Sequence, residues 1–285
     1  MDIIKRAILF GGKALVSVMD TTDVARTAKN IHGFSAPVTR AMARFLTMGA
    51  FICSTFKSKG DRLTAIIQSD REIGKMVVCG ECGGYVRCYC DNPTALADVK
   101  GASVAEVVGN DGQLNIIKDL GLKEPYNGLT GLVSGNISHD FAYYFAVSEQ
   151  INSAIALGCN LDDEGEVAVS GGIIVQPMPG CEEEILVILE DIVGNFTDVA
   201  GLLASHSPEE IIDYYFGHFD IEYLPDVFPR YQCVCSRAKA VEMLSALGEK
   251  EALEVIKEQG KIEIKCDFCN STYTFDEEDV KEIFR

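Results

Sequence analysis

The sequence has few basic residues and no long apolar run, and each shortage excludes a class of partner. It contains 25 Lys and Arg against 43 Asp and Glu, which gives a formal net charge of −18. Nucleic-acid binding needs a basic face, so we expect no nucleic-acid partner. No segment approaches the roughly 18 consecutive apolar residues of a membrane-spanning helix, so we expect no membrane partner.

The first residues lack the pattern of a secretory signal. Charges at Asp2, Lys5 and Arg6 and the glycines at Gly11 and Gly12 interrupt any apolar core, and no small-residue cleavage site follows. We therefore expect a cytoplasmic protein in a reducing compartment. There, the 11 cysteines of the chain favour metal binding or regulated redox chemistry over permanent disulfides.

Common catalytic motifs are also missing. The sequence has no P-loop lysine motif, no G-x-G-x-x-G and no G-x-S-x-G. The histidines have neither the H-E-x-x-H nor the H-x₃-H spacing, and we interpret them as structural or solvent-facing. They are His32, His139, His206 and His218. We expect that the protein is not an enzyme.

Four cysteines near the C-terminus form the most informative motif. They are Cys233 and Cys235 in a C-x-C pair, and Cys266 and Cys269 in a C-x-x-C pair. Two separated thiolate pairs can supply the four ligands of a tetrahedral Zn²⁺, and strand-like segments at 261–265 and 271–275 flank the second pair as in a zinc ribbon. Two interpretations stay open: a permanent structural zinc, or a redox switch whose adjacent cysteines close into reducible disulfides.

A second cysteine group lies earlier in the chain, at Cys79, Cys82, Cys88 and Cys90. It could form another thiolate site. However, Cys82 begins a glycine turn, and strand alternation places Cys88 and Cys90 on one face, where a free cysteine acts as a small apolar residue. We favour the apolar interpretation for this group, and also for Cys53 and Cys159, which lie in apolar stretches.

Hydrophobic periodicity divides the chain into three zones. Residues 1–180 alternate strands with a few helices, which predicts an α+β core domain with a mainly antiparallel sheet. The expected strands are 6–10, 14–19, 63–68, 75–79, 85–90, 113–118, 153–160 and 166–176. The expected helices begin after Ser35, with Pro37 in the first turn, and at Asp140, where the helix extends to Glu149.

Residues 181–229 form an acidic, helical zone. Ser207 and Glu210 make a capping box with Pro208 in the first turn, which predicts a helix over 211–216. An earlier helix has its apolar positions at helical spacing: Ile185, Ile188, Leu189 and Ile192. Isolated helices of this length are marginal in water, so this zone is either an ordinary subdomain or a linker that unfolds when its support is removed.

Residues 230–285 form a small module around the cysteine pairs, with helices expected at 237–247, 250–259 and 277–284. A core of this size contributes about 3–5 kcal/mol, whereas a structural zinc contributes an apparent 10–16 kcal/mol or so. We therefore expect that loss of zinc unfolds the module.

The whole chain resembles the redox-regulated heat-shock chaperone family, the 33 kDa chaperonins. The cysteine order carries the resemblance, together with Leu132-Val-Ser-Gly135, Ser148-Glu149-Gln150-Ile151, Gly171-Gly172 and the Gly84-Tyr85-Val86 run. The extra cysteines at Cys79, Cys82, Cys88 and Cys90 depart from the family pattern.

The resemblance implies an ATP-independent holdase that holds one Zn²⁺ per chain when reduced, through Cys233, Cys235, Cys266 and Cys269. Oxidation then forms the disulfides Cys233–Cys235 and Cys266–Cys269, releases zinc, unfolds the linker and produces a homodimer that binds unfolded client proteins. Two other functions remain as alternatives: a constitutive zinc-ribbon module that binds a specific partner, and a thiol oxidoreductase.

Overall fold

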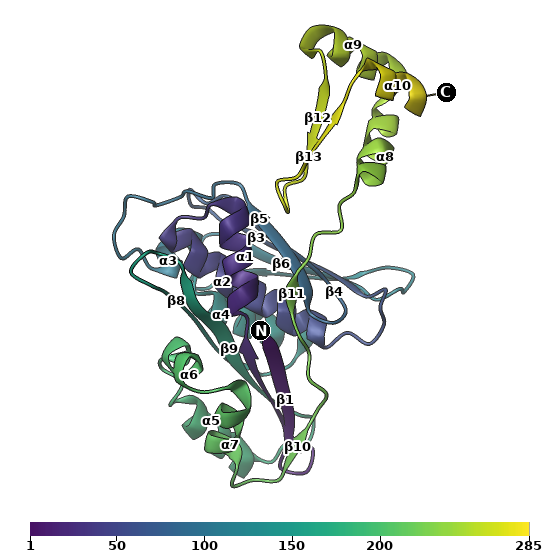
Figure 1. Cartoon of the computed structure of the whole chain (residues 1–285). Helices are drawn as coiled ribbons and strands as arrows, with labels where there is room; N and C mark the ends of the chain where they lie inside the picture. Colours follow the sequence, from purple (N-terminus) through teal and green to yellow (C-terminus); the bar gives the residue numbers. More distant parts are fainter. Residues whose placement is uncertain (285) are drawn as a thin grey trace. The chain divides into compact units, whose positions relative to one another are not determined.

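The computed structural model describes residues 1–284 and divides into two compact units, Met1–Tyr231 and a smaller unit that begins at Gln232 (Figure 1). The first unit contains a five-stranded and a six-stranded sheet, and the second contains a two-stranded sheet. In the described part of the chain, no helix is both long and apolar enough to cross a membrane. Antiparallel sheets with several helices confirm the predicted α+β class.

The five-stranded sheet has the order β10-β1-β2-β9-β8 and is antiparallel throughout. Its hairpin turn needs left-handed backbone at Phe10, Gly11 and Gly12, and glycine adopts that conformation without a Cβ clash. The strands are β1 Ile3–Leu9, β2 Ala14–Asp20, β8 Ala154–Leu161, β9 Val167–Pro177 and β10 Ile221–Tyr223. The sequence predicted the first four of these strands and did not predict β10.

The six-stranded sheet has the order β11-β5-β4-β3-β6-β7. Its described pairs are antiparallel except for the short parallel pair of β11 with β5. The strands are β3 Arg62–Gln68, β4 Lys75–Glu81, β5 Tyr85–Cys90, β6 Gln113–Asp119, β7 Tyr126–Gly131 and β11 Arg230–Tyr231. β7 and β11 were not predicted from the sequence.

Helices pack between the two sheets and form the main core with their inner faces. The central helix is α2 Ala36–Ser54, which begins where the Ser35 hydroxyl accepts a hydrogen bond from the N–H of Val38. It is buried along most of its surface because it has a sheet on either side. Its neighbours are α1 Thr22–His32, α3 Val104–Val108, α4 Ile137–Tyr144 and the π-helical turn η1 Phe145–Glu149.

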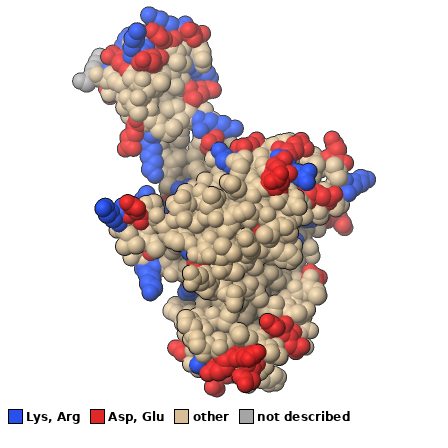
Figure 2. All heavy atoms as spheres, turned by 180° about the vertical axis from the view of Figure 1, so that it is seen from behind, with Lys and Arg blue, Asp and Glu red and all other residues tan. Residues whose placement is uncertain are grey.

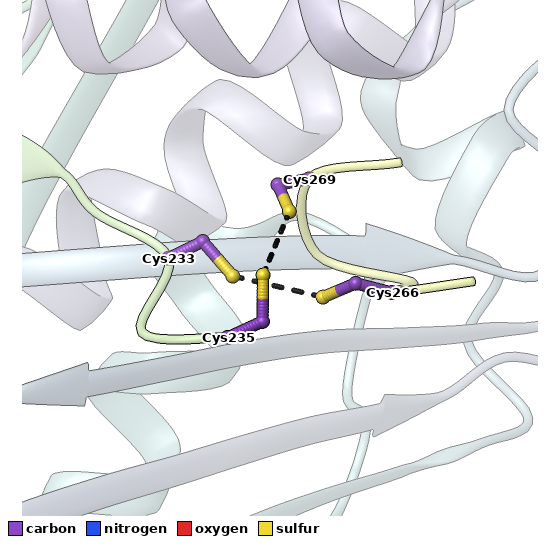
Figure 3. Close-up of side chains that lie close together, drawn as sticks. All are labelled: Cys233, Cys235, Cys266 and Cys269. Atoms are coloured by element: carbon purple, nitrogen blue, oxygen red, sulfur yellow. Dashed lines mark hydrogen bonds between the residues drawn. The ribbon is translucent and has the colours of Figure 1, made fainter. Parts of the chain in front are cut away.

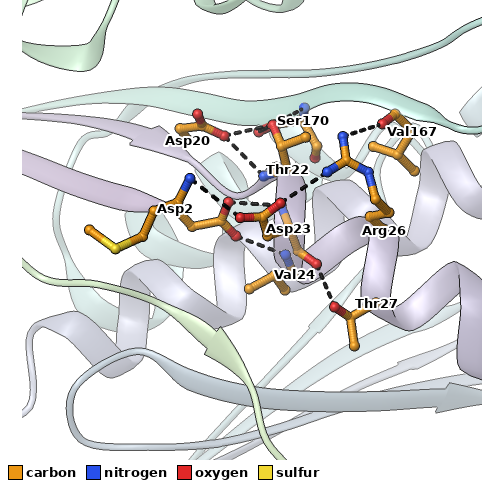
Figure 4. Close-up of polar contacts among 10 residues, drawn as sticks. Asp2, Asp20, Thr22, Asp23, Val24, Arg26, Thr27, Val167 and Ser170 are labelled. Carbon is orange, nitrogen blue, oxygen red and sulfur yellow. Dashed lines mark hydrogen bonds and ion pairs between the residues drawn. The ribbon is translucent and has the colours of Figure 1, made fainter.

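Helix α1 obtains its N-terminal cap from a distant residue (Figure 4). The buried carboxylate of Asp2 accepts hydrogen bonds from the N–H groups of Asp23 and Val24, at 2.7 and 2.8 Å. Burial raises the pKa of Asp2 to about 6, although these two hydrogen bonds act in the opposite direction. The cap joins the beginning of β1 to the helix that follows β2.

Three short helices cover the other face of the five-stranded sheet and form a second core with it. They are α5 Glu183–Val193, α6 Val199–Ser205 and α7 Pro208–Phe216. The capping box at Ser207 and Glu210 is present as predicted. In α5, Ile185, Leu189 and Ile192 pack on this core, whereas Ile188 is 37% exposed and does not belong to the packed face as the spacing predicted.

Glycines in the sheet allow α6 to approach closely. A Cβ added to Gly158 of β8 would lie 2.6 Å from the backbone nitrogen of Ala200 in α6, and one added to Gly171 of β9 would lie 2.5 Å from a methyl group of Leu203. Seen from behind, acidic side chains gather at the end of the first unit that carries these helices, and few charges lie across the middle of that face (Figure 2).

The second unit surrounds a small core with three helices and the hairpin of β12 Ile262–Lys265 and β13 Thr272–Phe275. Its helices are α8 Arg237–Leu247, α9 Glu249–Gln259 and α10 Glu277–Ile283, each within one or two residues of the predicted bounds. Helix α9 ends at Gly260, which has the left-handed conformation expected of a helix stop.

Candidate metal centre

The four C-terminal cysteines come together from two segments of the second unit (Figure 3). Cys233 and Cys235 precede α8, and Cys266 and Cys269 occupy the turn between β12 and β13. Their sulfur atoms all lie within 4.8 Å of one another. In the part of the chain that the structure describes, no other group of three or more cysteine, histidine or acidic residues is placed to hold a metal ion.

The sulfur atoms are spaced closely enough for a four-coordinate metal site. The Cys233 and Cys266 sulfurs are 3.6 Å apart, and the Cys235 and Cys269 sulfurs are 3.3 Å apart. A tetrahedral site with metal–sulfur bonds of about 2.3 Å requires sulfur–sulfur separations of about 3.8 Å. The cluster therefore needs only small adjustments to enclose a thiolate-preferring metal ion.

Main-chain hydrogen bonds shape the turn that presents the second pair. The N–H of Cys266 donates to the carbonyl of Ser271 at 2.9 Å, and the N–H of Asn270 donates to the carbonyl of Cys266 at 2.9 Å. Asn270 adopts a left-handed conformation, with φ of 58°, which turns the chain back into β13. This tight turn points both thiols toward the cluster, as in the knuckle of a zinc ribbon.

Two polar side chains of β13 and the residue before it contact the thiols. The Tyr273 hydroxyl donates to the Cys235 sulfur at 3.2 Å, and the Ser271 hydroxyl lies 3.2 Å from the Cys269 sulfur. Burial raises the pKa of Cys233 to about 12. Burial also acts to raise the pKa of Cys269, but hydrogen bonds to its sulfur have the larger effect. These bonds, chiefly the ones with Ser271, lower the pKa of Cys269 to about 7. The cluster thus already contains donors that stabilise a thiolate.

Arg237 fixes the first cysteine pair relative to the hairpin. Its guanidinium donates to the carbonyl of Thr274 at 2.9 Å, pairs with Asp279 at 2.7 Å and lies over the Phe275 ring at 4.3 Å. Arg237 is the first residue of α8, only two positions after Cys235. Sequence spacing gave no signal for Arg237 or Tyr273, because their contacts form only when α8 and β13 meet.

The earlier cysteines do not form a comparable cluster. Cys88 is fully buried in β5 within the main core, whereas Cys79 lies in β4, 3.7 Å from the Thr64 hydroxyl, and Cys82 follows β4 in the turn. Cys53 and Cys159 are buried, as predicted. Cys79 and Cys82 are also not at a helix N-terminus, the position that would lower a thiol pKa in a thiol oxidoreductase.

Comparison with known proteins decides the family. A family model described as Hsp33 protein matches residues 2–276. The chain belongs to the Hsp33 family. It is 36% identical to the 33 kDa chaperonin of Thermoanaerobacter sp. (strain X514), over all of this chain and 98% of that protein. It is also 36% identical to the 33 kDa chaperonin of Clostridioides difficile (strain 630), over all of this chain and 99% of that one.

A solved structure supports the same assignment. The crystal structure of the 33 kDa chaperonin (heat shock protein 33 homolog) from Thermotoga maritima superposes with a TM-score of 0.90 at 32% identity, covering 99% of this chain and 97% of that one. Family and names support a chaperone and are consistent with a protein that is not an enzyme. The four-cysteine cluster could hold a metal ion, consistent with the predicted zinc.

Proposed function

We propose that this protein is a redox-regulated, ATP-independent holdase of the cytoplasm. In the reduced state it holds one Zn²⁺ per chain through Cys233, Cys235, Cys266 and Cys269 and is inactive. Oxidation closes the disulfides Cys233–Cys235 and Cys266–Cys269 and releases zinc. The linker then unfolds, the protein forms a homodimer, and it binds unfolding proteins before they aggregate.

The observation that carries this proposal is a compact four-thiol cluster in a unit with very little core of its own. The second unit buries seven apolar side chains in its described residues: Ala240, Leu244, Ala252, Ile256, Ile262, Phe275 and Val280. Such a core contributes about 3–5 kcal/mol, against an apparent 10–16 kcal/mol or so for a structural zinc. The metal therefore holds the unit together.

Oxidation removes the ligands and hence that stabilisation. A thiolate is the form that attacks peroxide, which first converts it to a sulfenic acid, and zinc held by the cluster would keep the four cysteines in that form. A second thiolate displaces hydroxide and closes the disulfide. Formation of each disulfide thus transfers two electrons to one peroxide, whose two oxygens leave as hydroxide and take up protons from the solvent. Two disulfides leave no thiolate for zinc. The redox reaction is therefore coupled to unfolding through the metal.

The linker can unfold when zinc is lost because its helices are short and are stabilised by packing on one face of one sheet. We assign residues 1–180 as the core domain, 181–229 as the linker and 230–285 as the redox-switch domain. The linker helices cover the apolar side chains of β1, β2 and β9 that form the second core. Release of the helices exposes this face and their own apolar residues, and exposed apolar surface binds unfolded chains without sequence specificity.

An aggregation assay tests the proposal. A denatured client is diluted into buffer with zinc-loaded reduced protein or with peroxide-treated protein, and light scattering is followed. We expect suppression only after oxidation, together with release of one zinc per chain and the two adjacent disulfides in a peptide map. The Cys79→Ser/Cys82→Ser variant is the matched control and should respond as the parent does. Equal suppression in both redox states would instead indicate a constitutive partner-binding module.

A linker variant tests the same proposal without oxidant. Gly158→Val places side-chain atoms where the α6 backbone lies, so we expect α6 to detach and the reduced protein to suppress aggregation while still holding zinc. Ala168→Val, on an exposed position of neighbouring β9, is the matched control and should stay inactive when reduced. Hydrogen exchange in the six-stranded sheet checks that the core remains folded. A Gly158→Val protein with an open linker, intact core and no activity in either redox state would contradict the linker assignment.

A further inference from the structure

One extended segment lies along the edges of both sheets of the first unit. This segment, residues 221–231, is called the strap below, and it contains β10 and β11 (Figure 1). β10 is the outermost strand beside β1, and β11 is the outermost strand beside β5. Without the strap, β1 and β5 would be the edge strands of their sheets, and edge strands present unpaired main-chain groups that pair readily with another chain.

Main-chain hydrogen bonds hold the strap to β1. β10 pairs with β1 in antiparallel register, and beyond β10 the N–H of Leu224 donates to the carbonyl of Arg6 at 2.9 Å. The N–H of Ile4 then donates to the carbonyl of Val227 at 2.8 Å, and the N–H of Val227 donates to the carbonyl of Ile4 at 3.2 Å. These bonds depend on extended backbone and would be available to any extended peptide.

The strap continues onto β5 and ends at Tyr231, whose hydroxyl contacts are called the latch below. The N–H of Arg230 donates to the carbonyl of Gly84 at 3.3 Å, and Tyr231 is paired with Val86. The Tyr231 hydroxyl donates to the carbonyl of Cys88 at 3.2 Å and accepts from the N–H of Cys88 at 3.3 Å. It also lies 3.0 Å from Nε2 of His32 in α1. One phenol therefore satisfies both main-chain groups of Cys88.

Three side chains of the strap define what the edges can accept. Val227 and Tyr231, four positions apart, pack against the main core. Asp226 pairs with Lys5 of β1 at 3.1 Å, and this lysine also pairs with Glu209 of α7. The edges thus have places for an aliphatic residue, for an aromatic residue four positions later, and for a carboxylate immediately before the aliphatic residue.

In the sequence, the strap ends just before the first cysteine of the candidate metal centre. Only Gln232 separates Tyr231 from Cys233. Unfolding around Cys233 therefore leaves this end of the strap held only by the contacts of Arg230 and Tyr231 with the first unit. Elsewhere, the ion pairs of Lys5 link the strap to α7. The strap has no apolar core of its own, so its main-chain bonds are the first to open when both ends are released.

We propose that the strap covers, in the reduced protein, the strand edges that clients bind after oxidation. Once the strap is displaced, the edges of β1 and β5 bind extended segments of unfolding proteins by strand addition. This inference rests on the proposed function and names the client chemistry: an extended segment with a carboxylate, an adjacent aliphatic residue and an aromatic residue four positions further on. Strand addition takes its affinity from main-chain hydrogen bonds and its selectivity from pockets for alternate side chains, which suits a protein that must accept many sequences.

A labelled peptide with the sequence of residues 221–232 serves as the probe, with the full-length protein in both redox states. We expect the peptide to bind the oxidised protein at least tenfold more tightly than the zinc-loaded reduced protein, whose edges are covered. We also expect it to compete with carboxymethylated, permanently unfolded lactalbumin. Hydrogen exchange should show the amide of Ile4 opening on oxidation and becoming protected again when either ligand binds.

The matched control is the same peptide N-methylated at the positions of Leu224, Val227 and Arg230, whose N–H groups donate to the carbonyls of Arg6, Ile4 and Gly84. It keeps every side chain and loses those donors. We expect at least a tenfold loss of binding. A second peptide, with phenylalanine at the position of Tyr231, loses only the hydroxyl contacts and should bind a few-fold more weakly.

The outcomes separate this inference from the proposed function. If the oxidised protein fails to hold lactalbumin, the proposed function fails. If it holds lactalbumin but does not bind the peptide, or binds the N-methylated peptide equally well, strand addition is wrong while the holdase stands. If the Ile4 amide becomes protected on oxidation alone, in proportion to protein concentration, the edges pair with a second copy of this chain, and that result also overturns the inference.

A variant of the intact protein gives an independent measurement. Tyr231→Phe removes the latch hydroxyl from Cys88 and His32 and leaves the ring in place. We expect the amides of Ile4 and Arg230 to exchange about tenfold faster in the reduced protein, with zinc content unchanged. His218→Phe, at an exposed position before the strap, is the control and should leave both amides at their parental rates. Unchanged exchange in Tyr231→Phe would show that the latch does not hold the strap.

Discussion

The two cysteine groups contain the same two kinds of pair but lie in opposite environments. Each contains one C-x-x-C and one C-x-C pair, in reverse order along the chain. The C-terminal group gathers four sulfurs within 4.8 Å of one another. The earlier group spreads over β4, the turn after it and β5, where Cys88 is buried against the helices and Cys79 points to the other side of the sheet with Thr64.

The difference follows from what joins the pairs. In the second unit, two helices separate the pairs and return the chain to the same point, and a tight turn presents the second pair. In the first unit, an ordinary hairpin joins them, with Val78 of β4 opposite Cys88 and Met76 opposite Cys90. Pairing in a regular sheet places cysteines opposite other residues, and alternation directs neighbours to opposite faces. Spacing alone therefore does not make a thiolate site.

The largest expected effect is on zinc. Cys269→Ser should reduce zinc from one per chain to nearly none in reduced protein, because removal of one of four thiolates destroys a closed site. Residues after Tyr231 should then lose protection against hydrogen exchange, while the sheets of the first unit keep theirs. Release by a mercurial with a colorimetric chelator measures the metal. Two zinc ions per parental chain would show that the earlier group also binds.

A smaller effect is expected in the core, where Cys88 fills space. Cys88→Ser should destabilise the first unit by about 1–3 kcal/mol, since it buries a hydroxyl in an apolar site. Cys88→Ala leaves a small void and should cost about 1 kcal/mol. Thermal unfolding of both variants, with zinc content as the control, measures this order. If Cys88→Ser is more stable than Cys88→Ala, or if either variant loses zinc, Cys88 does not act as a buried apolar residue.

The smallest effect is on thiol reactivity as a function of pH. Burial raises the pKa of Cys90 to about 12 and that of Cys159 to about 11. Alkylation of Cys90 by iodoacetamide should therefore rise about tenfold per pH unit between pH 8 and 10, with no plateau in that range. Mass spectrometry of tryptic peptides measures the rate for each cysteine. A plateau near pH 8.5 would mean that Cys90 is solvated.

The same raised pKa values set the sign of the pH dependence of stability. The folded state favours the protonated thiol, so this contribution is complete below the ordinary cysteine pKa of about 8.5. It is lost as pH rises toward the folded values, because the unfolded chain loses its protons first. The first unit should accordingly unfold at lower temperature as pH increases above about 9.

Sequence reasoning succeeded where a signal was local. The hairpin turn at Gly11 and Gly12, the capping box at Ser207 and the bounds of α8 each depend on neighbouring residues, and the structure contains all three. The cysteine pairs were recognisable for the same reason. Helix α1 was missed although Asp20 offers a local start signal by accepting from the N–H of Thr22. The cap of the next two N–H groups comes from Asp2, which precedes β1 and gives no signal near the helix.

Sequence reasoning failed where pairing is between distant segments. β10 and β11 have only three and two residues and exist because β1 and β5 lie beside them, more than 140 positions earlier in the chain. β7 contains two glycines and is held by β6 alone in the described sheet. In the candidate metal centre, Arg237 and Tyr273 were invisible for the same reason, since tertiary contact gives them their roles.

The late position of the strap has a consequence for synthesis on the ribosome. β1 and β5 emerge long before residues 221–231, and at roughly 5–20 residues per second the β5 edge waits on the order of ten to thirty seconds for its cover. During that interval a nascent chain presents two open edges beside its neighbours on the same messenger. Fast translation of the linker, or a helper that shields nascent chains, would therefore raise the yield of this protein, whereas a pause before residue 221 would favour entanglement between copies.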